Sequence, residues 1–109
     1  MIKVQKYPRV FRIKSTTKQL IKITSAINDL NNSDFVEKII QETELSNIDF
    51  SSYNNYGKKS YNTVQATYTI SYSSNEKIEA VAQKHGLTRS QVLNLFLSKY
   101  LNIPIDHKD

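Results

Sequence analysis

Residues 64–72 read Val64-Gln-Ala-Thr-Tyr-Thr-Ile-Ser-Tyr72, and this stretch decides the fold. Its even positions are apolar or aromatic and its odd positions are polar, so the pattern has a period of two. Side chains in a β-strand alternate between two faces, so the pattern predicts a strand with one buried face. Such a strand is not stable alone. It needs a partner strand and a cover of helices.

A helix is expected directly after this strand, because the period of the apolar residues changes. The run Ser73-Ser-Asn75 offers side chains that can cap a helix. Apolar residues then recur at helical spacing at Ile78, Val81 and Ala82. Gly86 is expected to close this helix, because glycine adopts the left-handed conformation of a C-cap at little cost.

A second helix is expected to follow after a tight turn. Thr88 or Ser90 can cap its start, and Pro104 cannot continue it. The broad apolar stripe of this helix comprises Val92, Leu93, Phe96, Leu97, Tyr100 and Leu101. The C-terminal half is therefore predicted to be a strand, a helix, a turn and a helix.

The N-terminal half repeats this order of elements. After Pro8, residues 9–14 alternate, which places one face at Phe11 and Ile13 and the other at Val10, Arg12 and Lys14. Ser15-Thr-Thr17 supplies cap residues for a helix whose expected apolar residues are Leu20, Ile21, Ile23 and Ile27. Ser33 then opens a second helix, whose apolar face comprises Phe35, Val36, Ile39 and Ile40.

A shift of 57 residues superposes the two halves. It places Ile13 on Ile70, Ile21 on Ile78, Leu30 on Leu87 and Ser33 on Ser90. Thr24 and Ser25 fall where the second half has the apolar pair Val81 and Ala82, so a one-residue shift in the first helix is an open alternative. We divide the chain into a basic N-terminal arm (1–7), a first repeat (8–45), a linker (46–63) and a second repeat (64–105).

The charge of the chain is concentrated at its N-terminal end. The 109 residues carry a formal net charge of +5, and the stretch from Met1 to Asn28 holds seven basic residues and no acid. A basic segment of this kind is typical of proteins that bind a polyanion such as nucleic acid. On charge alone, an ordinary solvated basic surface explains the pattern equally well.

The composition also argues against several classes of protein. With no cysteine, the chain can form no disulfide scaffold, thiolate zinc site or cysteine nucleophile, and His85 and His107 lie too far apart for a histidine zinc motif. Paired catalytic carboxylates, nucleophile and base sets and glycine-rich phosphate loops are all missing, so we expect no enzyme, cofactor, metal or small-molecule ligand. No apolar run approaches the roughly 20 residues of a membrane span. A cytoplasmic protein is expected, bound to the nucleoid or in the cytoplasm of a host cell.

The order and spacing of these elements, found twice, resemble ribbon-helix-helix DNA-binding proteins of the Arc/MetJ/CopG type. The resemblance rests on Thr67-Tyr-Thr-Ile-Ser71, a helix ending at His85-Gly86, and a second helix after Leu87-Thr-Arg-Ser90. It implies a mainly α, α+β fold in which two strands form one antiparallel ribbon over four helices. We expect one chain to supply both strands as an intramolecular pseudo-dimer. A homodimer in which like repeats pair with like remains the alternative.

If the family's readout positions carry over, the polar face of the ribbon reads base edges in the major groove. These positions are Val10, Arg12, Lys14, Gln65, Thr67 and Thr69. The starts of the second helices then contact the phosphate backbone through exposed N–H groups, which nominates Asn32, Ser33, Thr88, Arg89 and Ser90. The same residues also have a purely structural interpretation. The strand residues would then form an ordinary solvent-facing edge, and the residues at the helix starts would act only as caps.

The predicted function is therefore sequence-specific binding to double-stranded DNA by a transcriptional regulator, most simply a repressor. Because the two strands differ, one pseudo-dimer should read an asymmetric half-site, and we expect copies to associate on adjacent sites. An accessory protein of plasmid transfer or partition is one alternative, and an antitoxin-type protein-binding module is another. The bias toward Asn, Ile, Lys, Ser and Tyr suggests a viral or plasmid origin.

Overall fold

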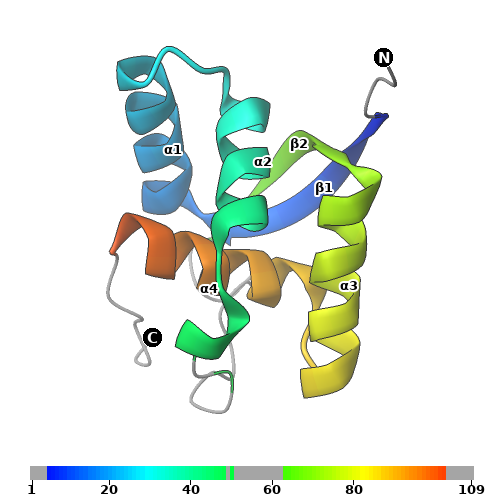
Figure 1. Ribbon diagram of the computed structural model, residues 1–109. Coiled ribbons are helices and arrows are strands. Elements are labelled where there is room, and N and C mark those ends of the chain that lie inside the picture. The colour runs from blue at the N-terminus through cyan, green and yellow to red at the C-terminus, as the bar shows by residue number, and fades with distance from the viewer. Residues whose placement is uncertain (1–4, 49, 51–62, 103–109) are drawn as a thin grey trace.

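Two strands and four helices follow one another in the order that the sequence predicts. The structure is a computed structural model that describes residues 5–48, 50 and 63–102. The elements are β1 (Lys6–Lys14), α1 (Ser15–Ile27), α2 (Asn32–Glu42), the short 3-10 helix η1 (Leu45–Asn47), β2 (Thr63–Ser71), α3 (Tyr72–His85) and α4 (Arg89–Leu101). β1 and β2 pair antiparallel within the chain (Figure 1). The predicted mainly helical α+β class with one two-stranded antiparallel ribbon is confirmed.

The two halves of the chain are equivalent position by position. Each element of the second half begins 57 residues after its counterpart: Thr63 after Lys6, Tyr72 after Ser15, and Arg89 after Asn32. The first helix therefore needs no one-residue shift. The pair Val10–Thr67 in the ribbon joins two equivalent positions, so a local twofold axis passes through it.

One face of the ribbon is the floor of the core. Phe11 and Ile13 of β1 are buried together with Ala66, Tyr68 and Ile70 of β2. Residues that lie opposite each other in an antiparallel pair share a face, and Phe11 lies opposite Ala66. Burial also raises the pKa of the Tyr68 phenol to about 12.

The helices of each half cover the strand of the other half. α2 packs on β2, and α4 packs on β1, while α2 also contacts α3 and α4 (Figure 1). The apolar faces predicted for α2 and α3 are buried, as are Val92, Leu93, Phe96 and Leu97 of α4. Because each half supplies the cover of the other, neither half has a complete core of its own.

The prediction for the apolar face of α1 was wrong at three of four positions. Ile21 is buried, but Leu20, Ile23 and Ile27 are exposed. The 57-residue equivalence explains this orientation, because it places Ser25 where α3 has the buried Ala82. The buried Ser25 hydroxyl has two acceptors for its single hydrogen, the Asn32 side-chain oxygen at 2.8 Å and the Lys22 carbonyl at 3.1 Å.

Three of the four predicted helix starts also differ from the structure. Asn31 caps α2 in place of Ser33, and Ser71 caps α3 in place of residues 73–75. α1 follows Lys14 and has no side-chain cap. Thr88 caps α4 with a full capping box, and Gly86 closes α3 in the left-handed conformation with φ 68°, as predicted.

Parts of the predicted arm and linker belong to the folded domain. β1 begins at Lys6, inside the predicted arm, and η1 and the buried Phe50 lie at the start of the predicted linker. Residues 1–4 and 51–62 lie outside the described part of the chain. In the described residues, no helix combines the length and the apolar character that crossing a membrane requires.

The two faces of β1 allow a test of the ribbon's orientation. Ile13 is fully buried, whereas Val10 on the opposite face is 48% exposed. We expect Ile13→Ala to lower the free energy of unfolding by about 2–5 kcal/mol, because it leaves a cavity in the core. Val10→Ala should cost less than about 1 kcal/mol. Chemical denaturation of both variants checks this, and equal losses would contradict the assignment of faces.

Candidate nucleic-acid interface

The second face of the ribbon is polar and basic, and the residues at its centre are exposed. It comprises the even-numbered residues of β1 and the odd-numbered residues of β2, and none of these ten is acidic. All six residues predicted for base readout lie on it. Val10 lies opposite Thr67, and Arg12 lies opposite Gln65. Val10, Gln65 and Thr67 are exposed, and the other three are half-buried.

The Arg12 side chain lies across the ribbon toward the start of β2. Its Nε donates to the Thr63 hydroxyl at 3.2 Å, and its Nη2 donates to the Thr63 carbonyl at 2.9 Å. These contacts use two of the five donors of a guanidinium and hold the group on the outward face. Nearby, Lys18 of α1 donates to the Gln65 carbonyl at 3.4 Å, which brings another cation to this side of the ribbon.

The start of each second helix is hydrogen-bonded to the edge of a strand. The Ser33 hydroxyl of α2 accepts from the Thr69 backbone N–H at 2.9 Å, and the Ser90 hydroxyl of α4 accepts from the Arg12 backbone N–H at 2.9 Å. These two bonds are equivalent under the 57-residue shift. They satisfy outward-pointing donors of the two strand edges and fix both helix starts beside the polar face.

In the first turns of α2 and α4, the N-cap side chain accepts from one backbone N–H group. The Asn31 side chain accepts from the Asp34 N–H, and Thr88 accepts from the Gln91 N–H. Among the residues that the structure describes, the backbone N–H groups of residues 32, 33, 89 and 90 have no hydrogen-bond acceptor. These belong to four of the five residues predicted for phosphate contact. The fifth, Thr88, serves as the N-cap.

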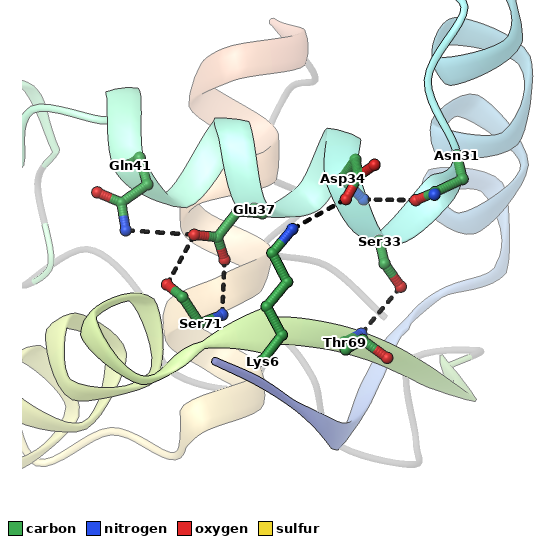
Figure 2. A network of polar contacts seen from close by, with 8 residues as sticks. All are labelled: Lys6, Asn31, Ser33, Asp34, Glu37, Gln41, Thr69 and Ser71. Carbon is green, nitrogen blue, oxygen red and sulfur yellow. Dashed lines mark hydrogen bonds and ion pairs between the residues drawn. The ribbon is translucent and has the colours of Figure 1, made fainter. Parts of the chain in front are cut away.

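The two helix starts differ in charge. Asp34 in the first turn of α2 forms an ion pair of 3.0 Å with Lys6 (Figure 2). The equivalent residue in α4 is the neutral Gln91. Arg89 of α4 lies with its guanidinium carbon 5.8 Å from the centroid of the Phe11 ring. The start of α4 is thus the more positive of the two. Residues predicted for base and for phosphate contact lie together in a cleft beside α2, which is lined by Asn32, Ser33, Thr67 and Thr69 and also by Asn31 and the ion pair of Lys6 and Asp34.

The sequence did not indicate the role of Glu37, which binds Ser71, the last residue of β2. Its carboxylate accepts from the Ser71 N–H at 2.8 Å and from the Ser71 hydroxyl at 2.7 Å (Figure 2). Burial alone would raise the pKa of Glu37. The hydrogen bonds from Ser71 and Ser74 and the charge of Lys6 outweigh burial, so that its pKa lies below the usual 4.5.

The equivalent residue on α4 also holds a strand edge. Asn94 donates to the Arg12 carbonyl at 3.0 Å and to the Ser90 carbonyl at 2.8 Å. Glu37 and Asn94 each follow the strand-binding serine by four residues, so both lie on the same face of their helix. A polar residue four positions after each serine was the signal in the sequence that could have identified this pair.

The comparisons with known proteins identified no relative of this chain. No protein-family model, no curated protein and no solved structure matches the chain. Within the described residues, no cluster of His, Cys, Asp and Glu is suited to hold a metal ion.

The lowered pKa of Glu37 predicts a loss of stability in acid. A carboxyl whose folded pKa lies below its unfolded value stabilises the fold above the unfolded pKa, and this contribution is lost as the pH falls through the folded value. We expect the free energy of unfolding to decrease as the pH drops below about 4.5. The decrease should be less steep in Glu37→Gln. Urea titrations between pH 3 and 7 measure this. Glu44→Gln, at an exposed position, is the matched control and should keep the wild-type slope.

Proposed function

We propose that the chain is a tandem ribbon-helix-helix protein that binds double-stranded DNA sequence-specifically and acts as a transcriptional regulator, most simply a repressor. The observation that carries this proposal is the acid-free outward face of the ribbon, flanked by two helix starts whose first two backbone N–H groups have no acceptor in the described part of the chain. The topology of two strands and four helices is consistent with that family. A repressor of this kind occludes a promoter by occupying it.

The size and chemistry of the ribbon suit the major groove. That groove is about 12 Å wide and admits a two-stranded ribbon, and each base pair presents a distinct pattern of donors and acceptors there. Arg12 suits bidentate contact with guanine, and Gln65 suits adenine. Val10 and Thr67, at the centre of the ribbon, offer methyl groups to thymine. Lys14 and Thr69 extend the same face toward its two ends.

The two helix starts suit the phosphates on either side of the groove. Backbone N–H groups at a helix start point along the axis, where the dipole also favours an anion. The Ser33 and Ser90 bonds to the strands set the position of these starts relative to the ribbon. Contacts of this kind orient a protein on DNA, whereas the ribbon specifies the sequence.

The two halves of the ribbon present different chemistry around the local twofold axis. Arg12 is equivalent to Thr69, and Pro8 is equivalent to Gln65. A single bound chain therefore contacts different groups on the two sides of the central pair. We infer that it reads an asymmetric half-site, and that palindromic operators, where they exist, are bound by two chains.

Replacement of Arg12 tests the assignment of the readout face. A duplex selected from a random pool by the wild-type protein is titrated with Arg12→Ala and with Lys84→Ala. Lys84 is the next-to-last residue of α3, and this end of the helix points away from the strands (Figure 1). Its removal therefore controls for the loss of one charge. Loss of a bidentate base contact is worth about 1–3 kcal/mol, which corresponds to roughly 5- to 150-fold in affinity.

The two variants should separate clearly in this assay. Arg12→Ala should lose most of the preference for the selected duplex over a scrambled one, with the helical circular dichroism unchanged. Lys84→Ala should weaken binding to both duplexes slightly and equally. Equal effects of the two variants, or no binding preference in the wild-type protein, would contradict the proposal.

A further inference from the structure

Two buried side-chain oxygens have no hydrogen-bond partner in the described part of the chain. They are the Thr17 hydroxyl oxygen, in the third residue of α1, and the Asn94 side-chain oxygen, in the middle of α4. Both residues are only 1% exposed. Leaving a buried polar atom without a partner costs free energy, so most such atoms in folded proteins bind other protein groups or ordered water. This pair therefore calls for a ligand.

The 57-residue shift relates these two residues to a pair that is in contact. Thr17 is equivalent to Ser74, and Asn94 is equivalent to Glu37. The Glu37 carboxylate accepts a hydrogen bond from the Ser74 hydroxyl and another from the Ser71 backbone N–H, so these side chains meet at the start of α3. The equivalence of the halves therefore places Thr17 and Asn94 side by side at the start of α1.

The Asn94 amide is shorter than the Glu37 side chain by one methylene, and two carbonyls fix its orientation. Its Nδ2 donates to the Arg12 carbonyl at 3.0 Å and to the Ser90 carbonyl at 2.8 Å. Because carbonyls only accept, the amide cannot exchange the places of its oxygen and nitrogen without losing both bonds. The Asn94 oxygen is thus held in one position, and it forms no bond with the Thr17 hydroxyl.

The chemistry of the two atoms selects the ligand. The Thr17 hydroxyl has a hydrogen to donate, whereas the Asn94 oxygen can only accept. An anion would be repelled by the Asn94 oxygen, and a cation is opposed by the positive end of the α1 dipole. A water molecule both donates and accepts, and it suits a buried site with two to four polar partners.

We propose that one ordered water molecule bridges the Thr17 hydroxyl and the Asn94 side-chain oxygen, at the position equivalent to the Glu37 carboxylate. Ser98, which is buried one turn after Asn94, offers a third partner, because its counterpart Gln41 binds the serine equivalent to Thr17 at 2.7 Å. The water joins α4 to the start of α1, which has no side-chain cap. It therefore takes the part between these helices that Glu37 and Gln41 take between α2 and α3.

A valine at position 17 tests the bridge, because it keeps the branched shape of threonine and removes the hydroxyl. If the hydroxyl binds the water, Thr17→Val leaves the water and Asn94 short of a partner. The equilibrium constant for unfolding, measured by urea denaturation, should then rise roughly fivefold. Thr16→Val, at the exposed neighbouring position, is the matched control and should change this constant by less than about twofold.

The opposite result has a clear meaning. If the Thr17 hydroxyl has no partner, the valine removes a buried unsatisfied group, and the stability should stay the same or increase. Either outcome would overturn the proposal, and so would equal losses in the two variants.

A crystal structure of the full chain, at a resolution that shows ordered water, identifies the ligand itself. It should show one water within about 3.2 Å of both the Thr17 and the Asn94 side-chain oxygens. No density at this position, or a direct bond between the two side chains, would overturn the proposal. Crystals grown in bromide separate water from an anion, and an anomalous bromide peak at the site would also overturn it.

Discussion

The antiparallel pairing of β1 with β2 is the interaction on which the rest of the structure depends. Each strand has one apolar face, and neither can bury it without a partner strand and a cover of helices. The pairing puts Phe11 opposite Ala66, so that the apolar faces of both strands form one continuous surface under the core. α2 then covers the strand of the second half, and α4 covers that of the first. The chain folds as one unit because each half completes the other.

The same pairing creates the face proposed to bind DNA. Because the apolar residues of each strand point into the core, Arg12, Gln65 and Thr67 point outward. The register places Thr67 at the centre of the ribbon and Arg12 opposite Gln65. Ser33 and Ser90 link this face to the helix starts through the strand edges. Stability and the proposed recognition thus share one set of backbone contacts, so the spacing between base-reading and phosphate-binding groups is set by the fold.

The sequence predicts those features that depend on period and order. The two strands, the buried faces of α2 and α3, and the Gly86 cap all follow from local patterns. The orientation of α1 does not, because its sequence offers more apolar residues than the core accepts. Ser25 occupies a buried place through its hydrogen bond to Asn32, a partner that only the tertiary structure brings close.

Helix starts and the polar residues of the candidate site were harder to predict for a related reason. Several Ser, Thr and Asn side chains near each start can act as caps, and the choice depends on which of them the strand requires. Ser33 binds the Thr69 N–H, and so Asn31 caps α2. Nothing local in the sequence indicates a partner for Glu37, but the end of β2 brings Ser71 to its carboxylate. Contacts between segments far apart in the chain decided both cases.

In the proposed complex, one chain forms one asymmetric ribbon and inserts its outward face into the major groove. A methylation-interference footprint on DNA upstream of the protein's own gene, at a protein concentration where one chain is bound per site, tests it most directly. Insertion of the ribbon should give interference by methyl groups at guanine N7, which lies in the major groove, within a core that is not palindromic. A strictly palindromic core under one bound chain, or interference confined to the minor groove, would contradict it.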